Sequence, residues 1–452
     1  MADQVKATDE PAVPNKGQMG PDWSGSACPT SREYNDIISV FRNYSLDPKK
    51  LGDLDALDNK YNCEIHSPAD AVTYGKEALH TLHDKYAAVM SNIEVDAFLT
   101  SLRGDIQGVG VQMRRDTDPA TGKGVDNGPV HISRVFPDTP AAAAGLQKGD
   151  LIVKVNGDPV AQKSLDQVTN AIRGPVGDPV TLTISRGGEE FDRTITRSQM
   201  HIPAVSDAQL LPGNVAYIQL QSFEANSSAE EVKAALEKFR DSRGVILDLR
   251  DNPGGQRDLA ILVTSLFMEK GVVMTVDDRI PSPITDPRFQ RTTISLTTDN
   301  IVSQAGAGTP QQTIRYPDLV NRPTVILVNG GSASASEIVA GALQDSQDAH
   351  LIGTRTGGKG VGQSFFDGPD GSLIKLTSSR SLLPKGRWVG DGDQNTIGIE
   401  PDEVVQNPAN AQPLSPDDVQ LQAALKWIAA QPDAKPPSWL PRFNFWPFSR
   451  NG

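Results

Sequence analysis

The sequence has few of the residues on which metal centres, disulfide frameworks and histidine-dependent active sites are built. Among its 452 residues there are only two cysteines and six histidines. Cys28 and Cys63 both lie in the N-terminal region, where one disulfide and two separate thiols are equally acceptable interpretations. His80 and His83 lack a third ligand and a His-Glu-x-x-His pattern. We therefore predict no metal site and no cofactor.

Long apolar runs and clusters of positive charge are also missing. No segment reaches the about 18 consecutive apolar residues of a transmembrane helix, so we expect no stable insertion into a membrane. Residues 1–6 show no apolar core of a secretory signal, which leaves the location uncertain. The net charge of −13 opposes the phosphates of nucleic acid and excludes nucleic acid as an expected partner. The oligomeric state is left open.

The N-terminal part divides into a polar segment and a helical one. Residues 1–30 are polar with scattered proline and glycine, and we expect them to be disordered. Residues 31–103 form a predicted helical region, because apolar residues such as Ile37 and Phe41 recur at helical spacing. Ser67, which proline follows, predicts a helix start with serine at the N-cap.

Residues 104–200 have the character of a small α+β domain, in which short β-rich runs alternate with turns and helical stretches. The expected strands cover residues 108–113, 130–135, 151–155 and 180–186, and the expected helices cover residues 141–146 and 164–172.

Residues 201–432 alternate strands and helices, which is typical of an α/β core with a parallel sheet. The expected strands cover residues 215–220, 245–249 and 324–328, and the expected helices cover residues 259–268 and 334–343. Ser227 and Ser228 stand three residues before Glu230 and Glu231, which predicts a capping box at the start of a further helix.

Two segments do not fit this alternation. Residues 279–322 are polar and carry several prolines and threonines, so we predict a long loop-like excursion. Residues 433–452 are rich in aromatic side chains but too short to span a membrane, and we expect this tail to pack onto the body of the protein.

A candidate nucleophile lies in the run Asn-Gly-Gly-Ser-Ala-Ser-Ala-Ser-Glu at residues 329–337. The run follows a buried strand and opens a helix, so Ser334 is expected at a helix N-terminus, where N–H groups and the helix dipole favour developing negative charge. Small neighbours let the chain turn sharply and let a substrate approach. Alone this signal is weak, because serine-rich helix starts are common.

A nucleophilic serine needs a base, and two candidates follow it in the chain. No histidine has a glycine-rich catalytic context, and the nearest, His350, lies at an expected strand start over residues 349–352. Lys359 stands among glycines in residues 356–363. A lysine acts as a base only when burial or positive neighbours lower its pKa, and without Ser334 a solvated turn lysine is the better interpretation.

Taken in order, the motifs of residues 80–430 resemble the carboxyl-terminal processing proteases, tail-specific peptidases with a Ser/Lys dyad. The resemblance to their PDZ module is carried by residues 108–111, 135–141, 144–152, 155–157 and 172–177. The resemblance to their protease core is carried by residues 247–255, 332–338, 343–345, 359–363 and 398–402.

The resemblance implies a multidomain α/β protein, with a crotonase-like protease core, an inserted PDZ domain and the N-terminal helical region. It implies a serine endopeptidase that forms an acyl-enzyme without a metal or nucleotide. Ser334 matches the family's nucleophile, Lys359 its base and Gln363 a glutamine that helps to position the base. The backbone N–H groups of Gly255 and Ala335 match its oxyanion donors.

The PDZ resemblance implies that protein or peptide tails bind as an added strand. Their carboxylate would be held near Gly108, Val109, Gly110 and Val111, and the two valines suggest apolar terminal side chains. The family works mostly outside the cytoplasm, which this sequence neither supports nor excludes.

The sequence departs from the family at Gly357, where a bulky residue is usual, and at Gly362, where valine or a similar residue is usual. These departures predict a looser lysine loop. They are the support for an alternative function, an inactive relative that binds peptide tails as a scaffold. A Ser-His-Asp hydrolase is a further alternative, which no histidine context favours.

Overall fold

The computed structural model describes most of the chain between residues 31 and 432. The described residues are 31–47, 51–52, 54–61, 64–102, 105–115, 128–163, 165–282, 286–316, 319, 321–408 and 411–432. The predicted disordered segment 1–30, the aromatic tail 433–452 and both cysteines lie outside them. Within the described ranges no helix has the length and apolar character needed to cross a membrane.

The centre of the molecule is a mostly parallel sheet in an α/β core. Its strand order is β10 (Val205–Leu211), β11 (Val215–Leu220), β12 (Gly244–Asp248), β17 (Thr324–Val328), β18 (His350–Gly353) and β21 (Glu403–Val404). Only the edge pair β10–β11 is antiparallel. Every residue of β12 and β17 is buried, which is the state expected of continuous apolar strands covered on both faces.

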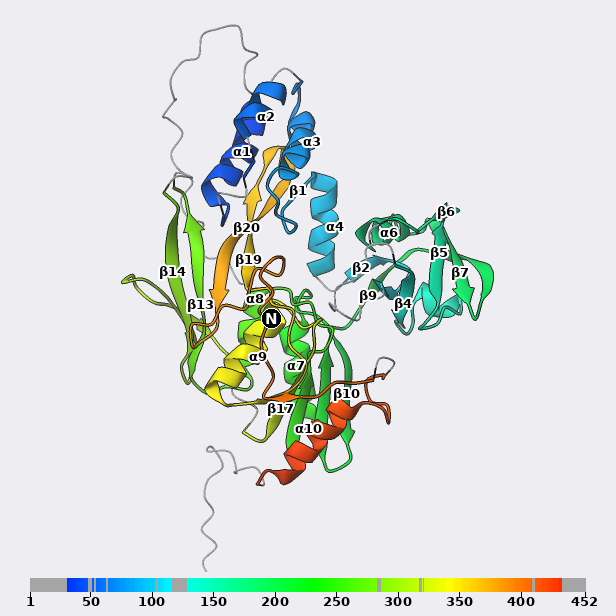
Figure 1. The fold of residues 1–452 in the computed structure, drawn as a ribbon, viewed down its shortest axis with the longest axis vertical. Helices are drawn as coiled ribbons and strands as arrows, with labels where there is room; N and C mark the ends of the chain where they lie inside the picture. The colour runs from blue at the N-terminus through cyan, green and yellow to red at the C-terminus, as the bar shows by residue number, and fades with distance from the viewer. Residues whose placement is uncertain are drawn as a thin grey trace, which may run out of the picture.

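Helices cover both faces of this sheet, so the predicted α/β layering is confirmed. One face packs against α7 (Ser228–Lys238), α8 (Arg257–Ser265) and α9 (Ala335–Ser346). The other face packs against α10 (Val419–Ala430), seen on the outer side of the core in Figure 1. The carboxyl ends of β11, β12 and β17 each lead through a loop into a helix, α7, α8 and α9 respectively, and the candidate site lies at the ends of β12 and β17.

The capping box predicted for α7 does not form. Ser227 is the N-cap, but its side chain accepts no helix N–H. Instead its hydroxyl donates to Glu231 Oε1 at 2.7 Å, while Oε2 of the same carboxylate accepts the N–H of Val205 at 2.8 Å. Glu231 thus ties the helix start to β10, a partner that sequence spacing does not reveal.

A second sheet is antiparallel and lies beside the core. Its order is β1 (Ala88–Met90), β20 (Leu373–Leu382), β13 (Gly271–Ile280), β14 (Arg288–Leu296), β15 (Asn300–Ala305) and β16 (Gln311–Ile314), and β19 (Val361–Asp367) also pairs with β20. The predicted loop-like excursion 279–322 is therefore largely a meander of strands. Its threonines and polar residues lie on strands that are mostly exposed or only partly buried, so the sequence of these strands is easily mistaken for a loop.

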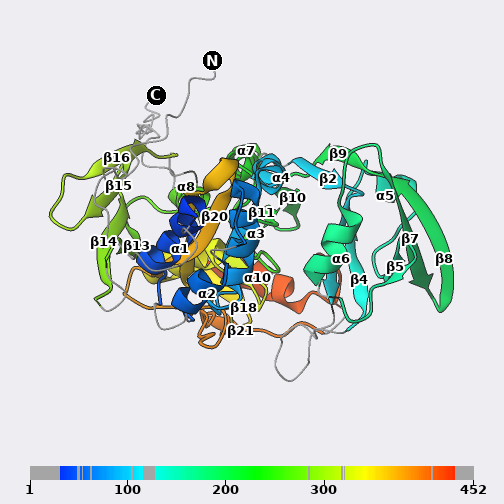
Figure 2. The ribbon, with the colours of Figure 1, turned by 90° about the horizontal axis from the view of Figure 1, so that it is seen from above.

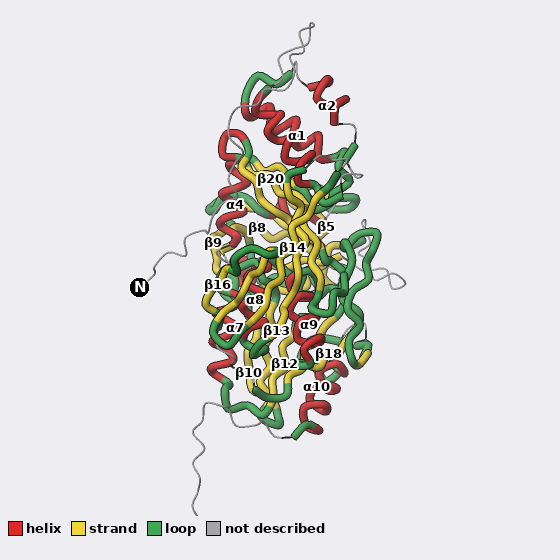
Figure 3. The backbone as a smooth tube through the Cα atoms, turned by 90° about the vertical axis from the view of Figure 1, so that its left-hand side faces the viewer, coloured by secondary structure: helices red, strands yellow, loops and turns green. Residues whose placement is uncertain are grey.

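The N-terminal region packs on one end of β20, as Figures 1 and 3 show. It contains α1 (Arg32–Tyr44), α2 (Leu54–Tyr61), α3 (Pro68–Leu79), the short strand β1 and α4 (Asn92–Leu102). Ile37, Ile38 and Phe41 are buried with Ile374 and Leu376 of β20. The predicted N-cap is confirmed, since Ser67 accepts the N–H of Asp70. This packing brings the segment between α3 and β1 to the lysine loop.

The α+β module stands to one side of the core, opposite β14–β16 in Figure 2. Its elements are β2 (Asp105–Gly108), β3 (Val111–Arg115), β4 (Val130–Val135), α5 (Pro140–Ala143), β5 (Leu151–Val155), β6 (Asp158–Pro159), α6 (Leu165–Ile172), β7 (Pro179–Arg186), β8 (Glu189–Thr196) and β9 (Ser198–His201). Its apolar residues form a separate core.

One predicted strand of this module is wrong in its extent. Residues 108–113 do not form a single strand, because β2 ends at Gly108 and β3 begins at Val111. Gly110 between them has φ +88°, and a Cβ there would lie 2.3 Å from Cβ of Thr139. Only glycine fits this turn, which separates the pair β2–β9 from the larger sheet.

Candidate active site

Ser334 occupies a strained turn between β17 and α9. It is the N-cap of α9 with φ 56° and ψ −115°, a conformation that costs a non-glycine residue about 1–3 kcal/mol. The turn is held by its neighbours: Ala333 N–H and the Ser336 hydroxyl both donate to the carbonyl of Asn252, at 3.0 and 2.8 Å. The side chain is half-buried. The turn thus presents a serine at a helix N-terminus, as the sequence predicted.

The glycine pair after β12 lies directly against this turn. A Cβ on Gly254 would lie 2.8 Å from Cβ of Ser334 and 2.7 Å from the backbone N of Ala335. The carbonyl of Gly254 accepts the backbone N–H of Phe223 at 2.8 Å, and the N–H of Gln256 donates to the carbonyl of Phe223 at 2.8 Å. These two bonds form a parallel bridge between Phe223 and Gly255. In such a bridge the N–H of Gly255 points away from Phe223. The structure therefore brings the two predicted oxyanion donors onto adjoining segments.

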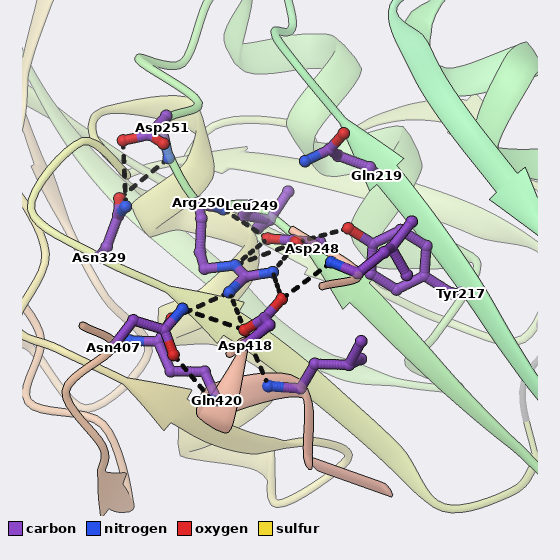
Figure 4. Close-up of polar contacts among 12 residues, drawn as sticks. Tyr217, Gln219, Asp248, Leu249, Arg250, Asp251, Asn329, Asn407, Asp418 and Gln420 are labelled. Carbon is purple, nitrogen blue, oxygen red and sulfur yellow. Dashed lines mark hydrogen bonds and ion pairs between the residues drawn. The ribbon is translucent and has the colours of Figure 1, made fainter. Parts of the chain in front are cut away.

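A buried ionic network anchors the loop that follows β12 and carries Gly254 and Gly255 (Figure 4). Arg250 is paired with Asp248 at 2.6 Å and with Asp418, the N-cap of α10, at 2.7 Å. The two carboxylates are fully buried and the arginine is 5% exposed. Burial is the largest single influence on Asp418 and raises its pKa, but the hydrogen bond to Arg250, the charge of Arg250 and the hydrogen bonds from Asn407 and Leu421 together outweigh burial, so the pKa is lowered. Losing one partner would leave a buried charge unpaired, so the network resists movement of the loop.

Glu337 joins the candidate nucleophile to the candidate base. Its Oε2 accepts the backbone N–H of Ser334 at 2.9 Å and that of Lys359 at 2.8 Å. Its Oε1 accepts the N–H of Gly358 at 2.8 Å and the hydroxyl of Thr356 at 2.6 Å. The side chain is 1% exposed. Burial raises its pKa, and the four hydrogen bonds lower it in part.

Sequence reasoning assigned no role to Glu337, although a signal was present. Ser-x-x-Glu is the pattern in which a glutamate at the third helical position accepts the N–H of the N-cap residue, and Ser334 N–H makes this bond. What the pattern could not reveal is that the same carboxylate also holds the loop of Lys359.

Lys359 sits in a shielded position beside the N-terminal region. Its Nζ lies 4.2 Å from the centroid of the Tyr86 ring. Burial, followed by the positive charges of Lys375 and Lys85, lowers its pKa to about 8, while Asp84 and Glu224 act in the opposite direction. Among the described residues no hydrogen bond joins the side chains of Ser334 and Lys359. The two residues are brought together through Glu337, with the amine resting on the ring.

The loop of Lys359 is tightly held, contrary to the looseness that its glycines predicted. The backbone N–H of Gly357 donates to the carbonyl oxygen of Ser332 at 2.9 Å, and that of Gly360 donates to the carbonyl oxygen of Gly390 at 2.6 Å. A Cβ on Gly357 would lie 3.1 Å from both Cβ of Ala333 and the carbonyl oxygen of Gly330, and one on Gly362 would lie 2.4 Å from the Ser379 hydroxyl. Glycine is used here because neighbouring chains approach closely.

Two further residues considered in the sequence, Gln363 and His350, make contacts elsewhere than with the side chains of Ser334 and Lys359. Gln363 on β19 donates from Nε2 to the Thr377 hydroxyl at 3.1 Å, rather than to Lys359. His350 begins β18, pairs with Val325 near the start of β17 and stacks on Trp427 with ring centroids 4.7 Å apart. Because Ser334 follows the carboxyl end of β17, this histidine lies at the opposite end of the sheet.

The predicted tail-binding segment surrounds the start of β3. Among the described residues β3 pairs only with β4, so its other edge is available, and α6 lies against it. The carbonyl of Val109 accepts the N–H of Ala141 at 2.8 Å, and that of Gly110 accepts the N–H of Phe136 at 3.1 Å. These bonds fix the turn that precedes the edge strand.

A serine at a strained strand-to-helix turn, with backbone donors beside it and a shielded lysine, has the parts that nucleophilic serine catalysis requires. Comparison with known proteins identifies the family. Residues 214–405 match the model of peptidase family S41, and residues 103–185 match the PDZ domain. Residues 214–405 therefore belong to peptidase family S41, and residues 103–185 form a PDZ domain.

Curated relatives are similar over most of this chain. A probable CtpA-like serine protease of Staphylococcus epidermidis is 32% identical over 333 residues, covering 72% of this chain and 59% of that protein. The corresponding protein of Staphylococcus aureus strain COL is 30% identical over 363 residues, covering 78% of this chain and 65% of that protein. The chain thus spans about three fifths of the length of these relatives.

Solved structures share the fold. A photosystem II D1 C-terminal processing protease matches with a TM-score of 0.52 and 24% identity, over 82% of this chain and 92% of that one. A putative S41 protease from Bacteroides fragilis matches with a TM-score of 0.51 and 18% identity, over 92% of this chain and 99% of that one. At these identities the likeness establishes the fold alone.

Proposed function

We propose that this protein is a serine endopeptidase that captures the C-terminal tails of protein substrates with its PDZ domain and cleaves them with Ser334 and Lys359. The observation that carries the proposal is the Glu337 carboxylate, which accepts the backbone N–H groups of both residues on one oxygen. Members of one dyad must be held together by the fold, and this carboxylate does so directly.

The lysine is suited to act as a general base. With a pKa of about 8, a useful fraction of its amine is unprotonated near neutral pH. The amine takes the Ser334 hydroxyl proton while Oγ bonds the scissile carbonyl carbon. It then returns that proton to the leaving amine as the C–N bond breaks. Water releases the resulting acyl-enzyme, with Lys359 again as base. Gln363, the third residue of β19, donates to the Thr377 hydroxyl and so helps to fix the strand that follows the lysine loop.

The oxyanion of the tetrahedral intermediate accepts hydrogen bonds from the backbone N–H groups of Gly255 and Ala335. Donors of this kind contribute about 2.7–4 kcal/mol each to transition-state stabilisation in comparable sites. The ionic network at Arg250 holds the Gly255 loop in place before substrate arrives, so the donors need little reorganisation during reaction.

The PDZ domain supplies the substrate preference. A tail adds as a strand along the open edge of β3, beside α6, with its carboxylate at the turn formed by residues 108–111. Tethering raises the local concentration of the chain near Ser334. The partners are therefore proteins or peptides with apolar C-termini.

The test is cleavage of an unstructured peptide that ends in an apolar residue, followed by mass spectrometry. Wild type should cleave it, Ser334→Ala and Lys359→Ala should not, and His350→Ala should behave as wild type. Amidating the peptide C-terminus should raise KM. Turnover by Ser334→Ala refutes the proposal. Tail binding without cleavage, and without labelling of Ser334 by a fluorophosphonate, supports the scaffold alternative instead.

A further inference from the structure

Tyr86 brings an aromatic side chain from the N-terminal region to the candidate base. It lies between α3 and β1, outside both segments that match the family models. The Lys359 Nζ is 4.2 Å from the centroid of its ring. Its hydroxyl donates to the carbonyl of Gly392 at 3.0 Å, and its backbone N–H donates to Asp84 Oδ1 at 3.0 Å. The ring is therefore held from both ends over the amine.

The loop on the far side of the lysine completes this arrangement. Lys359 forms a backbone bridge with Asp391, and Gly392 follows it. A Cβ on Gly392 would lie 2.4 Å from the Tyr86 hydroxyl and 3.0 Å from Cβ of Lys359. Glycine at this position lets the tyrosine and the lysine side chain pass close to each other. The two side chains and the loop thus form one packed unit.

We infer that Tyr86 is a positioning residue for the base: its ring closes one side of the lysine pocket to water and holds the amine at the site between turnovers. The inference rests on the proposed function of Lys359 as general base. It makes the N-terminal region, which neither family model covers, a contributor to the active site.

The ring acts on the amine in two opposite ways. Its face attracts an ammonium ion, which favours the protonated lysine. Its body excludes water, which favours the neutral amine. Burial is the largest cause of the lowered pKa of Lys359, and the ring is part of what buries the amine. We therefore expect exclusion of water to be the larger of the two effects of the ring. Removing the whole ring admits water and should raise the pKa of the lysine. Keeping the ring but weakening the attraction between its face and the ammonium ion should lower that pKa.

Substitutions at residue 86 leave the other charged residues around this unit in the sequence, and Lys85 Nζ also lies 5.1 Å from the centroid of the Tyr86 ring. Those that face Lys359 or Tyr86 are Lys375 on β20, Lys85 and Asp84 beside Tyr86, Glu224 after β11, Asp391 and Asp393 in the opposite loop, and Glu337 on α9. Burial, followed by Asp393 and Asp391, raises the pKa of Tyr86 to about 12, so the phenol stays neutral across the pH range of an assay.

The experiment measures kcat/KM for an apolar-tailed peptide against pH in the full chain, using four versions of residue 86. Tyr86→Phe should keep the midpoint of the acid limb. Tyr86→Ala should move the midpoint up by about one pH unit, and so lower the rate near pH 7 roughly tenfold while recovering most of it at high pH. Phenylalanine with three ring fluorines preserves shape but weakens the ring face, and should move the midpoint below that of Tyr86→Phe.

Tyr74→Ala is the matched control, because Tyr74 packs on Tyr61 within the same region and away from the lysine. It should leave the midpoint unchanged. Equal midpoints for all versions of residue 86, with rates lowered uniformly over pH, overturn the inference and leave the proposed function standing. Full activity of Lys359→Ala overturns both. Should Tyr86→Ala fail to fold, the fluorinated and plain phenylalanine pair decides the matter.

Discussion

Replacing Glu337 tests how the nucleophile and base are held together. In Glu337→Gln the side-chain amide nitrogen is best placed where Oε1 was, facing Thr356, because the Thr356 hydroxyl can accept a hydrogen bond from it. The amide oxygen then takes the place of Oε2 and still accepts the backbone N–H groups of Ser334 and Lys359. The N–H of Gly358 then loses its acceptor, since it now faces the amide nitrogen. Losing one hydrogen bond to a charged group costs about 1.5–3 kcal/mol. At roughly 2–4 °C per kcal/mol, Tm should fall by about 3–12 °C.

Glu337→Ala removes the acceptor for all four donors. Three backbone N–H groups are left buried without their partner, at about 1–3 kcal/mol each, and the loop of Lys359 is no longer tied to Ser334. We expect a far larger fall in Tm and no labelling of Ser334. The glutamine variant should retain part of the wild-type labelling rate.

The assay pairs thermal unfolding by circular dichroism with the rate of fluorophosphonate labelling at Ser334. Glu189→Gln, on the exposed hairpin of the PDZ domain, removes one charge in the same way without a buried partner and should change neither readout. If Glu337→Ala labels at the wild-type rate with an unchanged Tm, the carboxylate does not organise the site and the reasoning is wrong.

Three further predictions concern the base, the oxyanion loop and the ionic network. Because the pKa of Lys359 is lowered to about 8 and its neutral amine is the active form, kcat/KM should rise as pH passes through about 8; a plateau already reached at pH 6 would contradict this assignment. Gly255→Ala places a Cβ 2.3 Å from the Phe223 carbonyl carbon and should abolish labelling, whereas Gly213→Ala, also at positive φ but in open space, should not; equal effects would point to backbone strain alone. Asp418→Ala should destabilise the protein by about 3–5 kcal/mol in urea unfolding, and the exposed Asp417→Ala by less than about 0.5 kcal/mol; similar midpoints would mean that the network contributes little.

Much of the architecture could be predicted because it is encoded locally. The apolar run of residues 324–328 predicts a fully buried strand, and β17 has these bounds. Elements were missed where the local pattern has two interpretations. The polar and threonine-rich residues of β14–β16 favour a loop as much as a half-exposed sheet, and only pairing with β13 decides between them.

The features of the candidate site also fall into those encoded by local sequence and those decided by tertiary packing. The order of motifs, the placement of Ser334 at a helix start and the glycines around Lys359 follow from the sequence alone, because each depends on neighbours within a few residues. The shielding of the lysine does not, since it requires the N-terminal region to dock on β20 and bring Tyr86 over the amine. Asp418 likewise reaches Arg250 across 168 residues. Short-range patterns determine elements, whereas the partner of a buried charge is decided only when distant segments pack together.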